Sequence, residues 1–125
     1  MTKLNKIGFA LWVMMLLCVA VGSLLPLNKV PSDAFMLGDK FLHLGAYLVI
    51  GVFALLAASN STLAFWLLGI SFTASLMIEI LQPLSGRSFE LLDIAANGIG
   101  VIIAIPIWWY VIFPLLSRYQ LNKGN

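Results

Sequence analysis

The chain has 125 residues, of which 62% are hydrophobic and only 10% are charged. A soluble domain carries about 25% charged residues, and a disordered chain is poor in hydrophobic ones, so the composition excludes both classes. A disulfide scaffold is excluded because the single cysteine, Cys18, cannot form an internal bridge. A net charge of +2 is too small to predict a nucleic-acid partner. The composition therefore predicts an integral membrane protein.

Four apolar stretches are long enough to cross a membrane as helices, which takes about 17–25 residues each. They cover residues 7–25, 41–58, 63–81 and 91–113. Together they predict an all-α bundle of four transmembrane helices in one domain, residues 1–125. The first stretch follows two lysines and also has the pattern of a cleaved signal peptide, but its length favours a helix that stays in the membrane.

Local sequence signals predict where these helices begin, end and bend. Pro26 and Pro31 fall in the first connection, and Asp39 is predicted to cap the start of the second helix. Pro83 predicts that the third helix ends just before it, because the residue preceding a proline is driven out of helical geometry. Pro106 lies inside the fourth stretch and predicts a kink there.

The basic residues around the stretches predict the orientation in the membrane. With four spans, both termini share one side, which carries Lys3, Lys6, Arg118 and Lys123 and no acidic residue. The other side carries Lys29, Lys40 and Arg87. Because the charges beside the first helix usually dominate, both termini are predicted to face the cytoplasm.

This topology predicts that polar residues gather at the outer end of the bundle. The second helix opens with Asp39, Lys40 and His43, the third closes with Glu79 and Gln82, the fourth opens with Asp93 and Asn97, and Arg87 and Glu90 lie in the loop between the last two. A charge at the bilayer centre costs at least about 2.5–3.5 kcal/mol, so the ionisable side chains are expected to face the interior. Arg87 is the expected partner of Glu79 or Asp93, because its guanidinium fits a carboxylate.

Several chemistries are open to these side chains. His43, Glu79 and Asp93 are candidate catalytic residues for acid–base chemistry, although they could equally hold the helices together by pairing. The same three have suitable types for metal ligands but no spacing signature, so no metal and no cofactor is expected. Lys40 and Arg87 could bind a phosphate group. A serine nucleophile is not expected, because no nucleophile elbow is present.

The ordered polar residues resemble those of the VanZ-like family of small bacterial membrane proteins. The matching pieces are Asp39-Lys40-Phe41-Leu42-His43 with Tyr47, Glu79-Ile80-Leu81-Gln82, Gly86-Arg87-Ser88-Phe89-Glu90-Leu91-Leu92-Asp93, and Asn97 with Gly100, within a motif region of residues 39–104. The resemblance implies a multi-pass protein of the bacterial cytoplasmic (inner) membrane with a role in the cell envelope. The family takes its name from a protein that lowers susceptibility to the glycopeptide teicoplanin, and that property is not carried over to this chain.

Taken together, these observations predict a ligand site at the outer end of the bundle. Its residues are Asp39, Lys40, His43, Glu79, Gln82, Arg87, Asp93 and Asn97. The expected partner is a membrane lipid or lipid-linked envelope precursor with an anionic or glycan headgroup. The alternatives are an enzyme that acts on such a headgroup, with His43 and Glu79 or Asp93 as the acid–base pair, and a purely structural membrane protein. The sequence leaves open whether the protein works alone, as a homo-oligomer or with a partner membrane protein.

Overall fold

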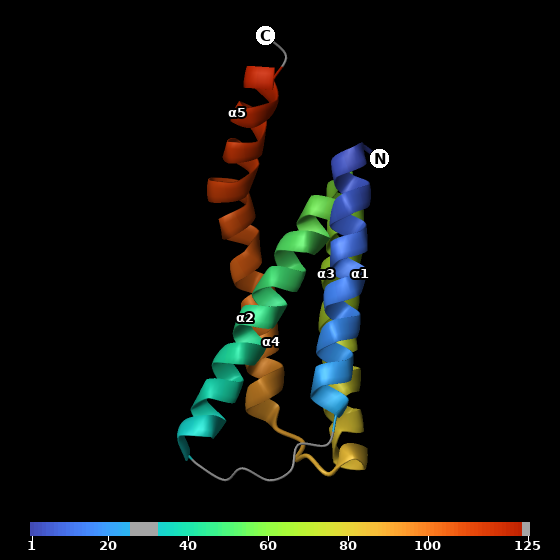
Figure 1. Ribbon diagram of the computed structural model, residues 1–125, viewed down its shortest axis with the longest axis vertical. Helices are drawn as coiled ribbons and strands as arrows, with labels where there is room; N and C mark the ends of the chain where they lie inside the picture. The colour runs from blue at the N-terminus through green and yellow to red at the C-terminus, as the bar shows by residue number, and fades with distance from the viewer. Residues whose placement is uncertain (26–32, 124–125) are drawn as a thin grey trace.

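The computed structural model describes residues 1–25 and 33–123, and these residues form helices and short connections (Figure 1). The elements are α1 (Lys3–Leu24), α2 (Asp33–Ala57), α3 (Ser61–Leu81), the 3-10 turn η1 (Gln82–Ser85), α4 (Leu91–Ile107), the π-helical segment η2 (Trp108–Ile112) and α5 (Phe113–Lys123). In this part of the chain, four helical segments are long and apolar enough to cross a membrane. The predicted all-α architecture with four spans is therefore confirmed.

Successive spans run in opposite directions, so the two ends of the chain lie at the same end of the bundle (Figure 1). The connection between α3 and α4 lies at the opposite end, which we call the loop end. α2 contacts α1, α3 and α4 and so forms the centre of the fold. The side chains that α2 directs inward therefore meet residues from the other three spans.

Small residues allow α2 to cross its neighbours closely. At Gly8 of α1, an added Cβ would lie 2.7 Å from the backbone nitrogen of Ala57. At Gly51 of α2, it would lie 2.6 Å from the Cβ of Ala104 in α4. At Gly100 of α4, it would overlap the carbonyl oxygen of Leu44. Such close crossings increase van der Waals contact between the helices. This contact drives helix association in a membrane, where burying apolar side chains gains little because lipid is equally apolar.

Polar side chains also fix the helices to one another outside the loop end. Thr2 and Asn5 form a capping box at the start of α1, which satisfies backbone donors that the helix leaves free. The Asn5 amide also donates hydrogen bonds to the carbonyl oxygens of Leu56 and Ala58, each at 3.0 Å, where α2 ends. Deeper in the bundle, the indole of Trp12 donates to Ser71 Oγ at 2.9 Å. α1 is therefore joined to both α2 and α3.

The predicted start of the second helix was wrong. α2 begins at Asp33, so Asp39 lies inside the helix and does not cap it. Gly38 is the one residue between them that disfavours a helix, and a single glycine costs only about 1 kcal/mol there. Pro26 and Pro31, which were assigned to this connection, lie outside the described residues.

The prolines of the last two spans behave differently from each other. α3 ends at Leu81 as predicted, and Pro83 lies in the first turn of η1. Pro106 lies inside α4, and the helical path continues past it into the π-helical segment Trp108–Ile112. The fourth span reaches Tyr119, beyond the predicted end at residue 113. The span therefore does not end at Pro106. The π-helical segment lies just before Pro114, whose missing amide hydrogen leaves the Tyr110 carbonyl without its usual α-helical donor.

Candidate functional site

Contacts at the loop end connect polar side chains from α2, α3, α4 and the loop that precedes α4. They include seven of the eight residues expected from the sequence: Asp39, Lys40, His43, Glu79, Arg87, Asp93 and Asn97. We call these seven residues, together with Glu90, the polar cluster. The eighth, Gln82, is buried, but its side-chain amide makes no hydrogen bond within the described residues.

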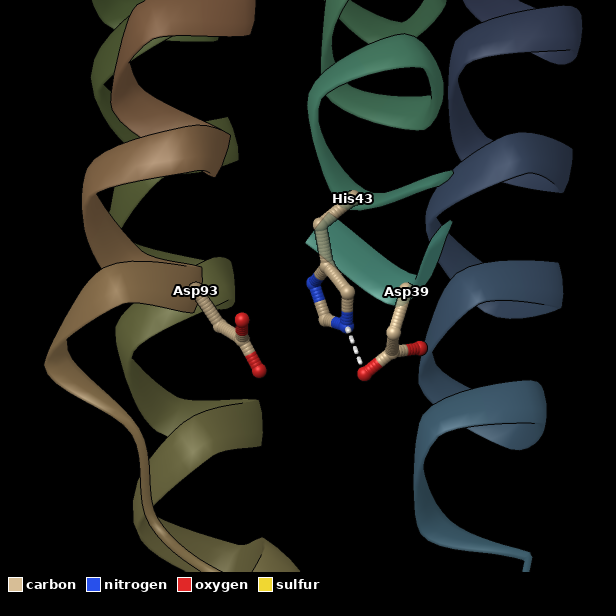
Figure 2. Close-up of side chains that lie close together, drawn as sticks. All are labelled: Asp39, His43 and Asp93. Atoms are coloured by element: carbon tan, nitrogen blue, oxygen red, sulfur yellow. Dashed lines mark ion pairs between the residues drawn. The ribbon is translucent and has the colours of Figure 1, made fainter. Parts of the chain in front are cut away.

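His43 lies at the centre of the polar cluster, and its ring is fixed from one side. Its Nδ1 lies 3.0 Å from Asn97 Oδ1, and the Asn97 amide nitrogen donates to Ser75 Oγ at 2.7 Å. Because the Asn97 oxygen can only accept, Nδ1 is the nitrogen that carries the proton. The lone pair of neutral His43 is then on Nε2, which lies 4.0 Å from Asp39 Oδ2 (Figure 2).

Three ion pairs formed by Lys40 and Arg87 tie the first half of α2 to α4 and to the loop before it. Lys40 Nζ donates to Glu90 Oε2 at 2.5 Å and to Asp93 Oδ1 at 2.9 Å. Arg87 Nη2 donates to Asp39 Oδ2 at 3.2 Å. Both cations therefore have carboxylate partners on a neighbouring segment.

The partner predicted for Arg87 was wrong. Arg87 pairs with Asp39 rather than with Glu79 or Asp93, and Lys40 pairs with Asp93. Asp39 is partly exposed, whereas Glu79 and Asp93 are buried. A guanidinium that reached a buried carboxylate would lose its hydration, so the more accessible carboxylate is the less costly partner.

Glu79 is the buried carboxylate of the polar cluster that lacks a hydrogen-bond partner among the described residues. Its side chain has no exposed surface, and neither carboxylate oxygen has a hydrogen-bond partner in the part of the chain that the structure describes. The His43 ring lies beside it, with Nδ1 3.8 Å from Glu79 Oε1. A buried carboxylate without a partner is costly to ionise, and such groups are typical of functional sites.

Ser75 is a participant that the sequence analysis missed, because a serine in a membrane helix rarely stands out. It lies four residues before Glu79, on the same face of α3, and this spacing is the signal that could have identified it. Glu90 was placed in the correct loop, but it was not assigned to the site. Its ion pair with Lys40 makes it part of the polar cluster.

A partly open cavity of about 270 Å³ adjoins the polar cluster. Its walls come from α1, α2 and the loop before α4, and the lining residues are Val19, Gly22, Ser23, Asp39, Leu42, His43, Ala46 and Arg87. Arg87, Asp39 and His43 give it a polar part, while the aliphatic side chains give it an apolar wall. A ligand that combines charge with hydrocarbon fits such a lining best.

Glu90 lies outside the membrane-spanning segments, and its ionisation makes the stability contributed by the cluster depend on pH. The hydrogen bond from Lys40 holds the pKa of Glu90 below its ordinary value of 4.5. The ion pair therefore stabilises the fold fully above pH 4.5, and this contribution is lost as the pH falls through the lowered pKa. We expect thermal unfolding of the detergent-solubilised protein to move to lower temperature over that acidic range, and Glu90→Gln to reduce the shift. Parallel pH profiles for the two proteins would contradict this.

The family model of VanZ/LLP1 matches residues 8–115. Neither the curated proteins nor the solved structures gave a match. The matched region extends from the first turns of α1 into α5, so it contains every residue of the polar cluster. The resemblance drawn from residues 39–104 is confirmed by this match.

Proposed function

Since this chain belongs to the VanZ/LLP1 family, we propose that it serves the cell envelope by binding the headgroup of an anionic lipid or a lipid-linked glycan. The observation that carries the proposal is the cavity beside the polar cluster, in which Arg87 and Asp39 lie next to an aliphatic wall. Four apolar helices support a place in a membrane, and the predicted orientation turns the loop end toward the outer leaflet.

Arg87 is the residue that would hold a phosphate group. It uses Nη2 for Asp39, which orients the guanidinium and leaves its other nitrogens able to donate. Guanidinium groups bind phosphate through two parallel hydrogen bonds, which gives direction as well as affinity. The Asp39 carboxylate accepts hydrogen bonds, so it suits hydroxyl groups of glycerol or a sugar in the same headgroup.

The size of the cavity limits what enters it. Pockets for drug-sized ligands occupy about 300–1,000 Å³, and this cavity has about 270 Å³. It therefore accommodates a headgroup but not the hydrocarbon chains. Those chains would leave through the open side of the cavity, along the exposed side chain of Leu42.

The test compares lipid binding to wild-type protein and to Arg87→Ala. Native mass spectrometry with phosphatidylglycerol, a polyprenyl phosphate and neutral phosphatidylcholine measures each affinity. Hydrogen bonds to charged groups contribute about 1.5–3 kcal/mol, so Arg87→Ala should weaken binding of the anionic lipids by at least about tenfold. Arg118→Ala is the matched control for nonspecific attraction to anionic headgroups, because Arg118 is exposed on α5, at the other end of the bundle, and its loss should weaken binding much less.

Equal affinity of wild type and Arg87→Ala for both anionic lipids would overturn the proposal. Thermal unfolding of each variant shows whether lost binding reflects lost folding, and Arg87→Lys, which retains the positive charge, should bind with intermediate affinity. The mass of the bound lipid after incubation separates the two functional classes. An unchanged mass indicates binding alone, while a changed headgroup would indicate acid–base catalysis by His43 with Glu79 or Asp93.

A further inference from the structure

Three side chains with metal-binding atoms converge at the loop end from α2 and α4. One ligand atom from each of Asp39, His43 and Asp93 lies within 4.8 Å of the others. Figure 2 shows the two carboxylates on either side of the His43 ring. We propose that these three residues bind a divalent transition-metal cation, of which Zn²⁺ and Mn²⁺ are the best matched to the ligands. This proposal does not depend on lipid binding.

The hydrogen bonding of His43 suits metal coordination. Histidines that bind metals generally donate the hydrogen of the other ring nitrogen to an oxygen acceptor, which fixes the ring. Here Nδ1 lies 3.0 Å from Asn97 Oδ1, and the Glu79 carboxylate stands behind it at 3.8 Å. Nε2, which lies 4.0 Å from Asp39 Oδ2, remains free to bind a cation. Asp93 uses Oδ1 for Lys40, and its Oδ2 is the oxygen that remains for the metal.

Glu79 is the second and independent observation that points to a cation. It is fully buried and directed at the His43 ring, and among the described residues no donor satisfies either of its oxygens. Because ionisation of Glu79 is costly in such a place, its carboxylate would carry a charge only with a positive charge nearby. A metal ion bound to Nε2 of His43 supplies that positive charge. The Glu79 carboxylate in turn raises the basicity of the imidazole and so strengthens its bond to the metal.

The charge balance of the polar cluster points the same way. Its four carboxylates, which belong to Asp39, Glu79, Glu90 and Asp93, face two fixed cations, Lys40 and Arg87. Asp39, Glu90 and Asp93 alone outnumber these cations by one charge, and Glu79, which burial makes costly to ionise, would add a second negative charge. A divalent cation offsets such an excess, which is otherwise costly in surroundings of low dielectric constant.

The ligand atoms indicate which cations fit. Calcium and magnesium ions prefer oxygen ligands alone, whereas an imidazole with carboxylates suits zinc, manganese and their neighbours. Ligands bound at about 2.0–2.2 Å lie at most about 4.4 Å apart, so the three side chains must close slightly around the ion. Asp39 and His43 also line the cavity, which gives the ion a path of access. Three protein ligands leave a coordination position open for water or a ligand oxygen.

The experiment uses Co²⁺ as a spectroscopic probe on the purified full-length chain in detergent. The protein carries no polyhistidine tag, and Cys18→Ser is the background because the exposed thiol of Cys18 is itself a metal ligand. Visible absorption should report one Co²⁺ per chain, displaced by Zn²⁺. Mutating a residue that only hydrogen-bonds to a metal ligand typically weakens metal binding by about 10–100-fold. Because His43→Gln removes the ligand itself, it should weaken Co²⁺ binding by at least about 100-fold.

Glu90→Gln is the matched control, because it removes a carboxylate of the cluster that is not among the three ligands. Because it changes only the charge around the site, it should weaken Co²⁺ binding far less than His43→Gln or Asp39→Asn. Pulsed electron paramagnetic resonance of Mn²⁺ bound to the Cys18→Ser protein needs no further variant and should show coupling to an imidazole nitrogen. Absence of that coupling, no Co²⁺ uptake, or equal affinity in His43→Gln would overturn the proposal. Because these measurements omit lipid, the lipid-binding proposal can fail without affecting them.

Discussion

Replacing Gly100 by alanine is expected to destabilise the bundle severely. The new Cβ would overlap the carbonyl oxygen of Leu44 and lie 2.9 Å from the backbone nitrogen of Leu48. Overpacking costs about 1–3 kcal/mol when side chains can adjust. Here the obstacle is the backbone of α2, so we expect the upper end of that range or more. The yield of monodisperse protein and the midpoint of thermal unfolding in detergent measure the effect.

Two other glycines provide graded controls for that substitution. Gly69→Ala meets no atom of the described chain within 4 Å, so it should be neutral or stabilise α3, since alanine is favoured over glycine by about 1 kcal/mol in a helix. Gly98→Ala meets the ring of Phe72 at 3.1 Å, and a side chain can move aside, so its effect should be intermediate. Equal unfolding midpoints for Gly100→Ala and Gly69→Ala would contradict the close crossing of α2 and α4.

Lys40→Met is expected to have the second large effect. It leaves Asp93, whose residue is only 2% exposed, and Glu90 without their cation. Removing one partner of a buried ion pair costs about 3–5 kcal/mol. The Lys40 side chain is 23% exposed, so solvent reduces the expected loss to about 2–4 kcal/mol. Unfolding by heat or by increasing fractions of denaturing detergent measures it.

Removing the stranded charges should restore much of this loss. In Lys40→Met combined with Asp93→Asn and Glu90→Gln, no carboxylate remains to be compensated at this position, so the stability should exceed that of Lys40→Met alone. Lys6→Met is the control, because Lys6 is exposed on α1 at the other end of the bundle. A loss as large in Lys6→Met, or no recovery in the triple variant, would show that the ion pairs do not carry the effect.

The architecture could be predicted from the sequence because each span has a local cause. Apolar length alone marks a segment that can cross a membrane, and Pro83 marks the end of α3 regardless of its neighbours. The start of α2 was placed seven residues late, because Asp39 is a good capping residue and no local signal shows that the helix begins before it. The π-helical segment Trp108–Ile112 was missed because the presence of a proline does not say how a helix adjusts to it.

The site could be predicted only as far as helical spacing reaches. The separation of four residues between Asp39 and His43 places both on one face of α2, and their side chains lie 4.0 Å apart. Which cation meets which carboxylate depends instead on how two helices cross, and that is set by close approaches such as the one at Gly100. The pairs of Lys40 with Asp93 and of Arg87 with Asp39 therefore could not be deduced from the order of the residues.

The length of the fourth span has a consequence for the geometry at the membrane surface. Its 29 residues extend about 43 Å at a rise of about 1.5 Å each, whereas the hydrocarbon layer is about 30 Å thick. An ordinary tilt of about 20° lengthens the path across that layer by only about 2 Å. The span is therefore longer than the hydrocarbon layer, and we expect its last turns to extend beyond it, with Arg118 among the lipid phosphates or in the water.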